Sequence, residues 1–110
     1  MAEMQASLGP EWERVADAND LSDGDVLSVQ STAGAVALYK VDGEFYATHG
    51  ICSHEHAYLA DGYLEGCEIE CPLHQARFDI RTGAALCKPA SDAIAVYQTK
   101  VIDDGVFVKM

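Results

Sequence analysis

Short apolar runs that alternate with polar residues recur toward both ends of the chain. They cover residues 25–30, 35–41, 44–48, 93–101 and 106–109. Each run is rich in β-branched or aromatic residues and is bounded by turn-forming residues, which is typical of strands. The pair Asp42-Gly43 separates two of these runs and favours a type I′ hairpin turn, in which both central residues have φ > 0. The pattern therefore predicts antiparallel β-strands.

No segment has the sustained 3.6-residue apolar period of a long helix. Residues 12–15 resemble a further short strand, and residues 11–17 and 53–60 each allow one short helical turn at most. Asp103-Asp104-Gly105 predicts a second tight turn, before the last strand. We therefore expect an all-β fold in which the two terminal parts of the chain pair in one antiparallel sheet or small barrel.

The stretch from residue 49 to residue 90 has a different composition. It is rich in Cys, His, Gly and Pro, and its only β-like runs are brief, at residues 67–70 and 77–80. Strand periodicity returns after it. We therefore expect an insert at one end of the β scaffold.

Length and charge narrow the classes of function. A chain of 110 residues forms one core of ordinary size, and a hydrophobic content of 49% is typical of a globular domain. There are 7 Lys and Arg against 18 Asp and Glu, so the formal charge is −11. A surface this acidic repels phosphate, which disfavours nucleic acid and anionic membranes and favours a partner with a basic patch.

The sequence also predicts a compartment. No apolar run approaches the roughly 20 residues of a membrane span. Residues 1–10 lack the basic and apolar parts of a signal peptide. We therefore expect a cytoplasmic protein without a membrane partner, in which metal binding or free thiols are favoured over disulfides.

Seven of the eight Cys and His residues lie between residues 49 and 74. Within this stretch, the first motif is Cys52-Ser53-His54 and the second motif is Cys71-Pro72-Leu73-His74, with sixteen residues between them. Each motif offers one thiolate and one imidazole. This set suits a cluster in which one iron is bound by both sulfurs and the other iron by both nitrogens. The alternative is a structural Cys₂His₂ zinc site, but zinc motifs usually separate the first two ligands by two to four residues, and one residue separates them here.

These two motifs resemble the Rieske [2Fe–2S] signature. The context agrees at Tyr46-Ala47-Thr48, Leu59, Asp61-Gly62, Leu64-Glu65-Gly66, Phe78-Asp79, Thr82-Gly83 and Pro89. The resemblance covers roughly residues 11–110 and points to the small ferredoxins of bacterial aromatic-ring-hydroxylating dioxygenase systems. It implies one Rieske domain over residues 1–110, with a cluster-binding subdomain at 49–87 and a basal β part at 11–48 and 88–110. It also implies one [2Fe–2S] cluster held by Cys52, His54, Cys71 and His74.

The sequence departs from this family pattern in two ways. The high-potential branch carries an additional disulfide between the loops, and Ala57 and Leu73 stand at the corresponding positions. The chain therefore resembles the low-potential branch, near the lower end of the range of about −150 to +300 mV. Family members usually have Gly after each histidine ligand, whereas Glu55 and Gln75 stand there. Both place larger polar side chains beside the expected cluster.

Several other residues are candidates for a chemical role. His56 would form a Cys-x₃-His pair with Cys52, but the family pattern selects His54, so we expect His56 to be an exposed loop residue. His49 is expected to form hydrogen bonds rather than to bind metal. Cys67 and Cys87 are expected to be free, partly buried thiols, and a disulfide or redox-sensing pair is the alternative.

Two further groups of residues are expected to serve the fold. We expect the aromatic side chains to pack in the core or to shield the cluster: Phe45, Tyr46, Tyr58, Tyr63, Phe78 and Tyr97. The acidic residues Glu65, Glu68, Glu70 and Asp79 are expected to form a solvated face, with partner docking as the alternative.

The resemblance implies an electron carrier rather than an enzyme. The four expected ligands would leave no open iron position, and no independent 2-His-1-carboxylate set is evident in the sequence. The implied partners are a flavoprotein ferredoxin reductase driven by NAD(P)H and a terminal oxygenase, and a monomer is the simplest state. A nitrite reductase small subunit, a zinc-stabilised binding module and a thiol-based redox sensor stay open as alternatives.

Overall fold

The computed structural model describes residues 11–32, 34–51, 57–72, 76–86 and 93–109. These residues form two antiparallel sheets and two short 3₁₀ turns, η1 (Ala18–Asp20) and η2 (Leu59–Asp61). The strands are β1 (Trp12–Asp17), β2 (Val26–Ser31), β3 (Gly34–Val41), β4 (Glu44–His49), β5 (Tyr63–Glu65), β6 (Glu68–Glu70), β7 (Arg77–Asp79), β8 (Val96–Ile102) and β9 (Gly105–Lys109). The described part of the chain contains no α-helix, which confirms the all-β expectation.

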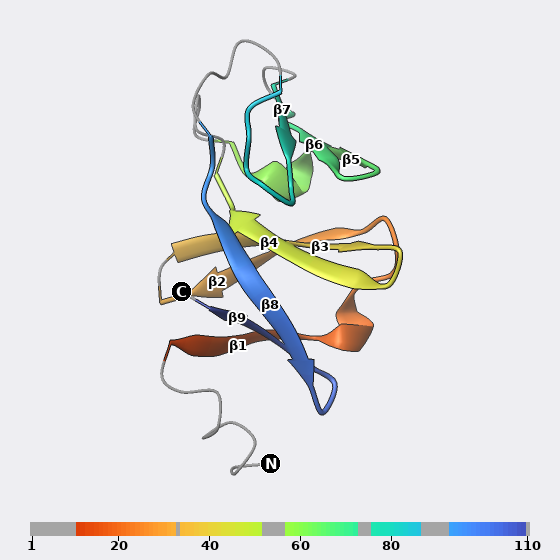
Figure 1. Ribbon diagram of the computed structural model, residues 1–110, viewed down its shortest axis with the longest axis vertical. Coiled ribbons are helices and arrows are strands. Elements are labelled where there is room, and N and C mark those ends of the chain that lie inside the picture. Colours follow the sequence, from red (N-terminus) through yellow and green to blue (C-terminus); the bar gives the residue numbers. More distant parts are fainter. Residues whose placement is uncertain (1–10, 33, 52–56, 73–75, 87–92, 110) are drawn as a thin grey trace.

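The larger sheet has the strand order β1-β9-β8-β4-β3-β2 (Figure 1). The last strand, β9, pairs with the first strand, β1, and β8 pairs with β4. The two terminal parts of the chain therefore share one antiparallel sheet, as the sequence predicts. Glu13 of β1 accepts hydrogen bonds from the backbone and the hydroxyl of Thr32, just after β2, so the two edges of the sheet approach each other.

Tight turns fix the register of this sheet. Asp42 and Gly43 have φ values of 53° and 80°, and Asp103 and Asp104 have φ values of 49° and 64°. Positive φ at both central residues is the requirement of a type I′ turn, whose twist matches that of paired strands. Both turns predicted from the sequence are confirmed.

The smaller sheet, of order β5-β6-β7, lies at one end of the molecule (Figure 1). The sequence predicts β6 and β7 but not β5. Three residues are too few for a periodic pattern, and Tyr63–Glu65 becomes a strand because it pairs along its whole length with Glu68–Glu70. Tertiary pairing therefore decides this element.

One expectation about an element boundary is wrong. The strand expected from residue 93 begins at Val96, because the backbone N–H of Ile94 donates to the carbonyl of Gly83, in the turn after β7. The short strand expected at residues 12–15 is confirmed as part of β1, Trp12–Asp17, which pairs with β9, so residues 11–17 form no helical turn. The short turn allowed over residues 53–60 corresponds in part to η2, at Leu59–Asp61.

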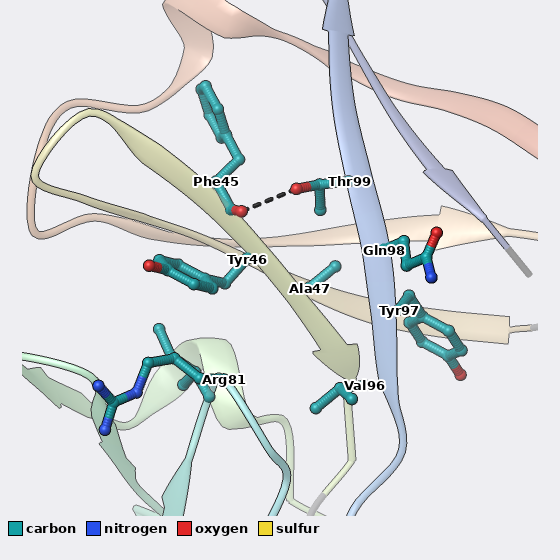
Figure 2. Close-up of a pocket in the computed structure, with 9 residues that line it drawn as sticks. Phe45, Tyr46, Ala47, Arg81, Val96, Tyr97, Gln98 and Thr99 are labelled. Atoms are coloured by element: carbon teal, nitrogen blue, oxygen red, sulfur yellow. Dashed lines mark hydrogen bonds between the residues drawn. The ribbon is translucent and has the colours of Figure 1, made fainter.

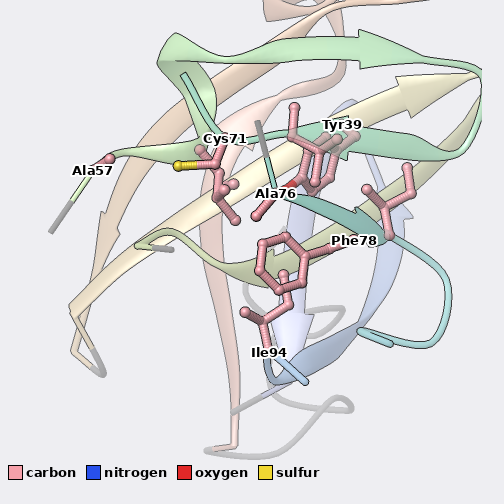
Figure 3. Close-up of a cluster of buried hydrophobic side chains, with 10 residues drawn as sticks. Tyr39, Ala57, Cys71, Ala76, Phe78 and Ile94 are labelled. Carbon is pink, nitrogen blue, oxygen red and sulfur yellow. The ribbon is translucent and has the colours of Figure 1, made fainter. Parts of the chain in front are cut away.

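Two buried clusters hold the sheets together. The large-sheet core lies within the larger sheet and contains Ala16, Leu21, Val36, Leu38, Ala47, Val106 and Val108. The inter-sheet core joins the two sheets and contains Ala37, Tyr39, Ala57, Leu59, Ile69, Cys71, Ala76, Phe78, Ile80 and Ile94 (Figure 3). It contains side chains from β3, β6, β7 and η2, so the smaller sheet is packed onto the larger one rather than tethered beside it.

The aromatic residues divide between core and surface. Phe78 is fully buried, and Phe45, Tyr46 and Tyr97 are half-buried. The expectation of core packing is wrong for Tyr58 and Tyr63, which are 46% and 68% exposed. Tyr63 lies on β5, an edge strand of the smaller sheet.

Among the described residues, no helix is long and apolar enough to cross a membrane.

Candidate metal centre

Cys71 of the second motif is the candidate ligand that the structure describes. It follows β6 directly and its side chain is 0% exposed, within the inter-sheet core (Figure 3). Its backbone N–H donates to the carbonyl of Ala76 at 2.7 Å. This bond fixes the two ends of the stretch that carries the rest of the second motif.

The first motif is bounded in the same way. Ile51 and Tyr58 form an antiparallel bridge, and the N–H of Leu59 donates to the carbonyl of Gly50 at 2.9 Å. Gly50 and Ile51, just before the first motif, are therefore paired with Leu59 and Tyr58, just after it. Cys52, His54 and His74, together with Leu73, Glu55, His56, Gln75, Cys87 and Pro89, lie outside the described residues.

The inter-sheet core brings the boundaries of the two motifs together. Ala57, which follows the first motif, and Cys71, which begins the second, belong to this core, as does Ala76 beyond the second motif (Figure 3). The donor set of two thiols and two imidazoles in two such stretches fits a [2Fe–2S] group with one sulfur-ligated and one nitrogen-ligated iron. The apolar surroundings of Cys71 exclude water from its side of the site.

The described residues do not offer a rival metal site. Within residues 11–32, 34–51, 57–72, 76–86 and 93–109, no group of three or more His, Cys, Asp or Glu side chains is arranged to hold a metal ion. His49 ends β4, and its backbone N–H donates to the carbonyl of Ala95. This bond belongs to the backbone, and the hydrogen-bonding role expected for the His49 side chain stays a prediction.

Cys67 is a free, partly buried thiol between β5 and β6, as expected. Its carbonyl accepts a hydrogen bond from the N–H of Ile80 at 2.9 Å. The backbone of Cys67 thus connects the β5–β6 turn to the end of β7.

Arginine side chains neutralise much of the acidic face predicted from the sequence. Arg77 of β7 forms ion pairs with Glu65, Glu68 and Glu70 at 3.3, 3.3 and 3.0 Å. These hydrogen bonds, that of Glu68 foremost, raise the pKa of Arg77. The face is therefore a cross-strand network rather than a set of separate solvated carboxylates.

Asp79 and Arg81 form a second pair, at the turn after β7. Asp79 accepts hydrogen bonds from the backbone N–H and from Nε and Nη2 of Arg81, at 2.8, 3.1 and 2.9 Å. These bonds lower the pKa of Asp79. The sequence analysis missed both arginines, although Arg77 and Arg81 are the two basic residues of the stretch 49–87, which contains six acidic ones.

An open cleft of about 580 Å³ separates the turn after β7 from β4 and β8 (Figure 2). It is lined by Phe45, Tyr46, Ala47, Ile80, Arg81, Val96, Tyr97, Gln98 and Thr99. Burial, with a smaller contribution from Cys67, raises the pKa of Tyr46. The guanidinium of Arg81 is already engaged by Asp79, and Cys71, the expected ligand that the structure describes, does not line the cleft.

Comparison with known proteins assigns the class. The model of the Rieske [2Fe-2S] domain family matches residues 11–98. The chain therefore belongs to the Rieske [2Fe-2S] domain family, whose members carry one [2Fe–2S] cluster.

Individual relatives narrow this class to ferredoxins. The chain is 50% identical over 99 residues to the ferredoxin component of the naphthalene 1,2-dioxygenase system of Pseudomonas putida, covering 90% of this chain and 95% of that protein. The Sphingomonas yanoikuyae B1 ferredoxin has a TM-score of 0.84 at 37% identity, covering 89% of this chain and 97% of the other. The matched chain in a complex of reduced oxygenase and oxidized ferredoxin in carbazole 1,9a-dioxygenase has a TM-score of 0.85 at 32% identity, covering 92% of this chain and 94% of the other. The protein is an electron-carrying ferredoxin of the aromatic dioxygenase type, not a catalyst.

Proposed function

We propose that this ferredoxin holds its [2Fe–2S] cluster through Cys52 and His54 of the first motif and Cys71 and His74 of the second. The supporting observation is that paired backbone segments bound both motifs and meet in the inter-sheet core, which contains Cys71. In this proposal residues 1–110 form a single Rieske domain. Residues 49–87 form its cluster-binding subdomain, and residues 11–48 and 88–110 form its basal part.

The bound group would supply a single one-electron redox step. The described residues contribute the setting for it. Cys71 provides a thiol fixed between β6 and Ala76, and the side chains of the inter-sheet core keep water from it. With two sulfur and two nitrogen ligands engaged, the chain would offer no open iron position for oxygen or an aromatic substrate.

The proposed partners are an NAD(P)H-dependent flavoprotein ferredoxin reductase as electron donor and a terminal aromatic-ring-hydroxylating oxygenase as acceptor. The carbazole dioxygenase complex, in which a related ferredoxin is bound to its oxygenase, supports the second partner. The net charge of −11 supports docking on basic surfaces of the partners. We propose a monomer that acts in the cytoplasm.

The ligand assignment is tested by metal analysis and EPR of the purified chain. We expect two irons and two acid-labile sulfides per chain and, after reduction with dithionite, a signal whose average g value lies below that of all-cysteine clusters. Cys52→Ser and His74→Ala are expected to lose the iron. Cys67→Ser and His56→Ala, which remove a thiol and an imidazole outside the proposed set, are the matched controls and are expected to keep it.

Three results would contradict the proposal. One zinc per chain without sulfide would indicate a structural Cys₂His₂ site. Full iron content in Cys52→Ser or His74→Ala would exclude that residue as a ligand. Loss of iron in His56→Ala, with retention in His54→Ala, would replace His54 by His56.

A further inference from the structure

Two hydroxyl side chains are buried together between β3 and β4. Tyr39 and Thr48 are both 0% exposed, and Thr48 is the buried polar residue of the described core. The phenol oxygen of Tyr39 lies 2.8 Å from Oγ1 of Thr48. Tyr39 pairs with Tyr46 across the strands and Ala37 with Thr48, so Tyr39 and Thr48 are diagonal neighbours on one face of the sheet.

The direction of the hydrogen bonds follows from counting protons. Oγ1 of Thr48 donates to the carbonyl of His49 at 2.9 Å, which uses the single proton of the threonine hydroxyl. Tyr39 must therefore donate to Thr48. Burial raises the pKa of Tyr39, so the phenol keeps the proton that this bond needs. The result is a directed chain from the Tyr39 hydroxyl through Thr48 to the His49 carbonyl.

This series of hydrogen bonds ends on the backbone that leads into the first motif. The N–H groups of His49 and Gly50 donate to the carbonyls of Ala95 and Ala35, each at 2.9 Å. A side chain at Gly50 would lie 2.9 Å from the backbone of Ala35, so this segment also lies against β3 without room for a Cβ. The carbonyl of His49 is bonded by the side chain of Thr48, whereas the N–H groups of His49 and Gly50 are bonded by backbone carbonyls.

The same phenol ring packs at the other motif. Tyr39 belongs to the inter-sheet core together with Cys71 and Ala76, which bound the second motif (Figure 3). One side chain therefore packs beside the second motif and, through its hydroxyl, restrains the backbone entering the first.

From this arrangement we infer that Tyr39 and Thr48 are positioning residues for the metal centre. Their hydrogen-bonded hydroxyls fix the His49 peptide, which leads into the first motif, relative to the inter-sheet core that contains Cys71. This inference rests on the proposed function, because it takes Cys52 and Cys71 as ligands. Neither residue is a ligand itself, and each acts through the backbone.

Thr48→Val tests the inference because it keeps the side-chain shape but removes the donor to His49. We expect the variant to fold and bind iron, to show altered EPR g values and midpoint potential, and to lose iron to a chelator about fivefold faster. Fivefold corresponds to about 1 kcal/mol, the net contribution of a typical hydrogen bond. Thr48→Ser keeps the hydroxyl and is expected to restore the wild-type spectrum and potential.

Thr99→Val is the matched control. Oγ1 of Thr99, on β8, donates to the carbonyl of Phe45 at 2.7 Å, so a threonine hydroxyl again holds a backbone carbonyl of β4, four residues before His49 (Figure 2). The control is expected to lower the unfolding temperature to a similar extent and to leave the spectrum, the potential and the rate of iron loss unchanged. A purely structural role for Thr48 would make the two variants alike.

The double variant Tyr39→Phe with Thr48→Val separates positioning from stability. Thr48→Val leaves the phenol of Tyr39 buried without an acceptor, and removing both hydroxyls relieves this cost. We expect the double variant to regain thermal stability while its spectrum and potential stay altered, because the His49 carbonyl still lacks its donor. Recovery of the wild-type spectrum and potential in the double variant would overturn the inference.

Failure of the inference is distinguishable from failure of the proposed function. Absence of a mixed-ligand [2Fe–2S] spectrum in the wild-type chain contradicts the proposed function. If the wild-type chain shows the mixed-ligand spectrum, and Thr48→Val leaves the spectrum, the potential and the rate of iron loss unchanged, only the inference is overturned. Hydrogen exchange at the amides of Gly50 and Leu59 gives a readout independent of the metal, and we expect it to accelerate in Thr48→Val but not in Thr99→Val.

Discussion

Asp79 shows how one carboxylate organises the turn that follows β7. Its side chain accepts three hydrogen bonds from Arg81, and its backbone carbonyl accepts the N–H of Gly83 at 2.7 Å. The pKa of Asp79 lies below its ordinary value of 3.8 because the ionised form receives these bonds. A lowered pKa in the folded chain means that this carboxylate stabilises the fold when ionised.

Asp79→Asn is expected to lower stability at about pH 7 by about 1 kcal/mol, a modest value because the Arg81 side chain is largely exposed. The contribution is fully present above the ordinary carboxyl pKa and is lost as the pH falls through the lowered pKa of the folded chain. The difference in unfolding temperature between wild type and variant should therefore stay nearly constant from about pH 7 to about pH 5 and shrink only as the pH falls through about 4 and below.

Asp61→Asn is the control for this prediction, because it removes the same charge from an exposed residue of η2. We expect it to change stability little. A difference between wild type and Asp79→Asn that stays constant with pH would assign the effect to the turn backbone rather than to the ionised carboxylate.

At the scale of elements, the smaller sheet depends on packing against the larger one. Three strands of three residues each offer few hydrogen bonds, and an isolated sheet of this size is not stable in water. The inter-sheet core and the backbone bond from Ile94 N–H to the Gly83 carbonyl, at 2.9 Å, supply the missing contacts. Gly83 has a φ of 81°, and a Cβ there would lie 2.0 Å from the carbonyl oxygen of Ile94.

Gly83→Ala is therefore expected to destabilise the chain by more than the cost of the backbone conformation alone. Gly24→Ala is the matched control, because Gly24 has a similar φ of 88° but open space where the Cβ would stand. We expect about 1 kcal/mol for Gly24→Ala and at least about 2 kcal/mol more for Gly83→Ala, measured by chemical unfolding. Equal losses in the two variants would show that the contact between Gly83 and Ile94 does not constrain the fold.

At the scale of the whole molecule, the formal net charge of −11 is expected to influence encounters with partners. A related ferredoxin is bound to its oxygenase in the carbazole dioxygenase complex, so association is part of how proteins of this type work. Complementary charge mainly raises the rate of association, and salt screens it. The ion pairs of Arg77 and Arg81 neutralise part of the smaller sheet, so the effect belongs to the molecule rather than to one acidic cluster.

We expect the rate at which a flavoprotein reductase reduces this ferredoxin to fall as ionic strength rises. Between about 10 mM and about 1 M salt the screening length falls from about 30 Å to about 3 Å, which removes long-range attraction. Stopped-flow reduction under second-order conditions measures this dependence. A rate that is constant across the range, with the reduction potential unchanged, would show that docking does not rely on charge.

The sequence by itself determined the strand pattern, the positions of the two tight turns and the spacing of the two Cys and His motifs. Each of these is local: the alternation of apolar residues sets the strands, the Asp-Gly and Asp-Asp pairs accept positive φ, and the spacing of Cys and His residues selects a ligand chemistry. The pairing of the terminal strands also follows from this pattern, because apolar strand faces need a common core.

Only the tertiary structure decided the short strand β5, the late start of β8 and the exposure of Tyr58 and Tyr63. It also brought Tyr39 to Thr48 and both arginines to their carboxylates. These features depend on contacts between backbone and side-chain groups that form only once the strands have paired and the sheets have packed. A short polar segment carries no periodic signal of its own, and a hydroxyl is stabilised in a core only when its partner is already in place.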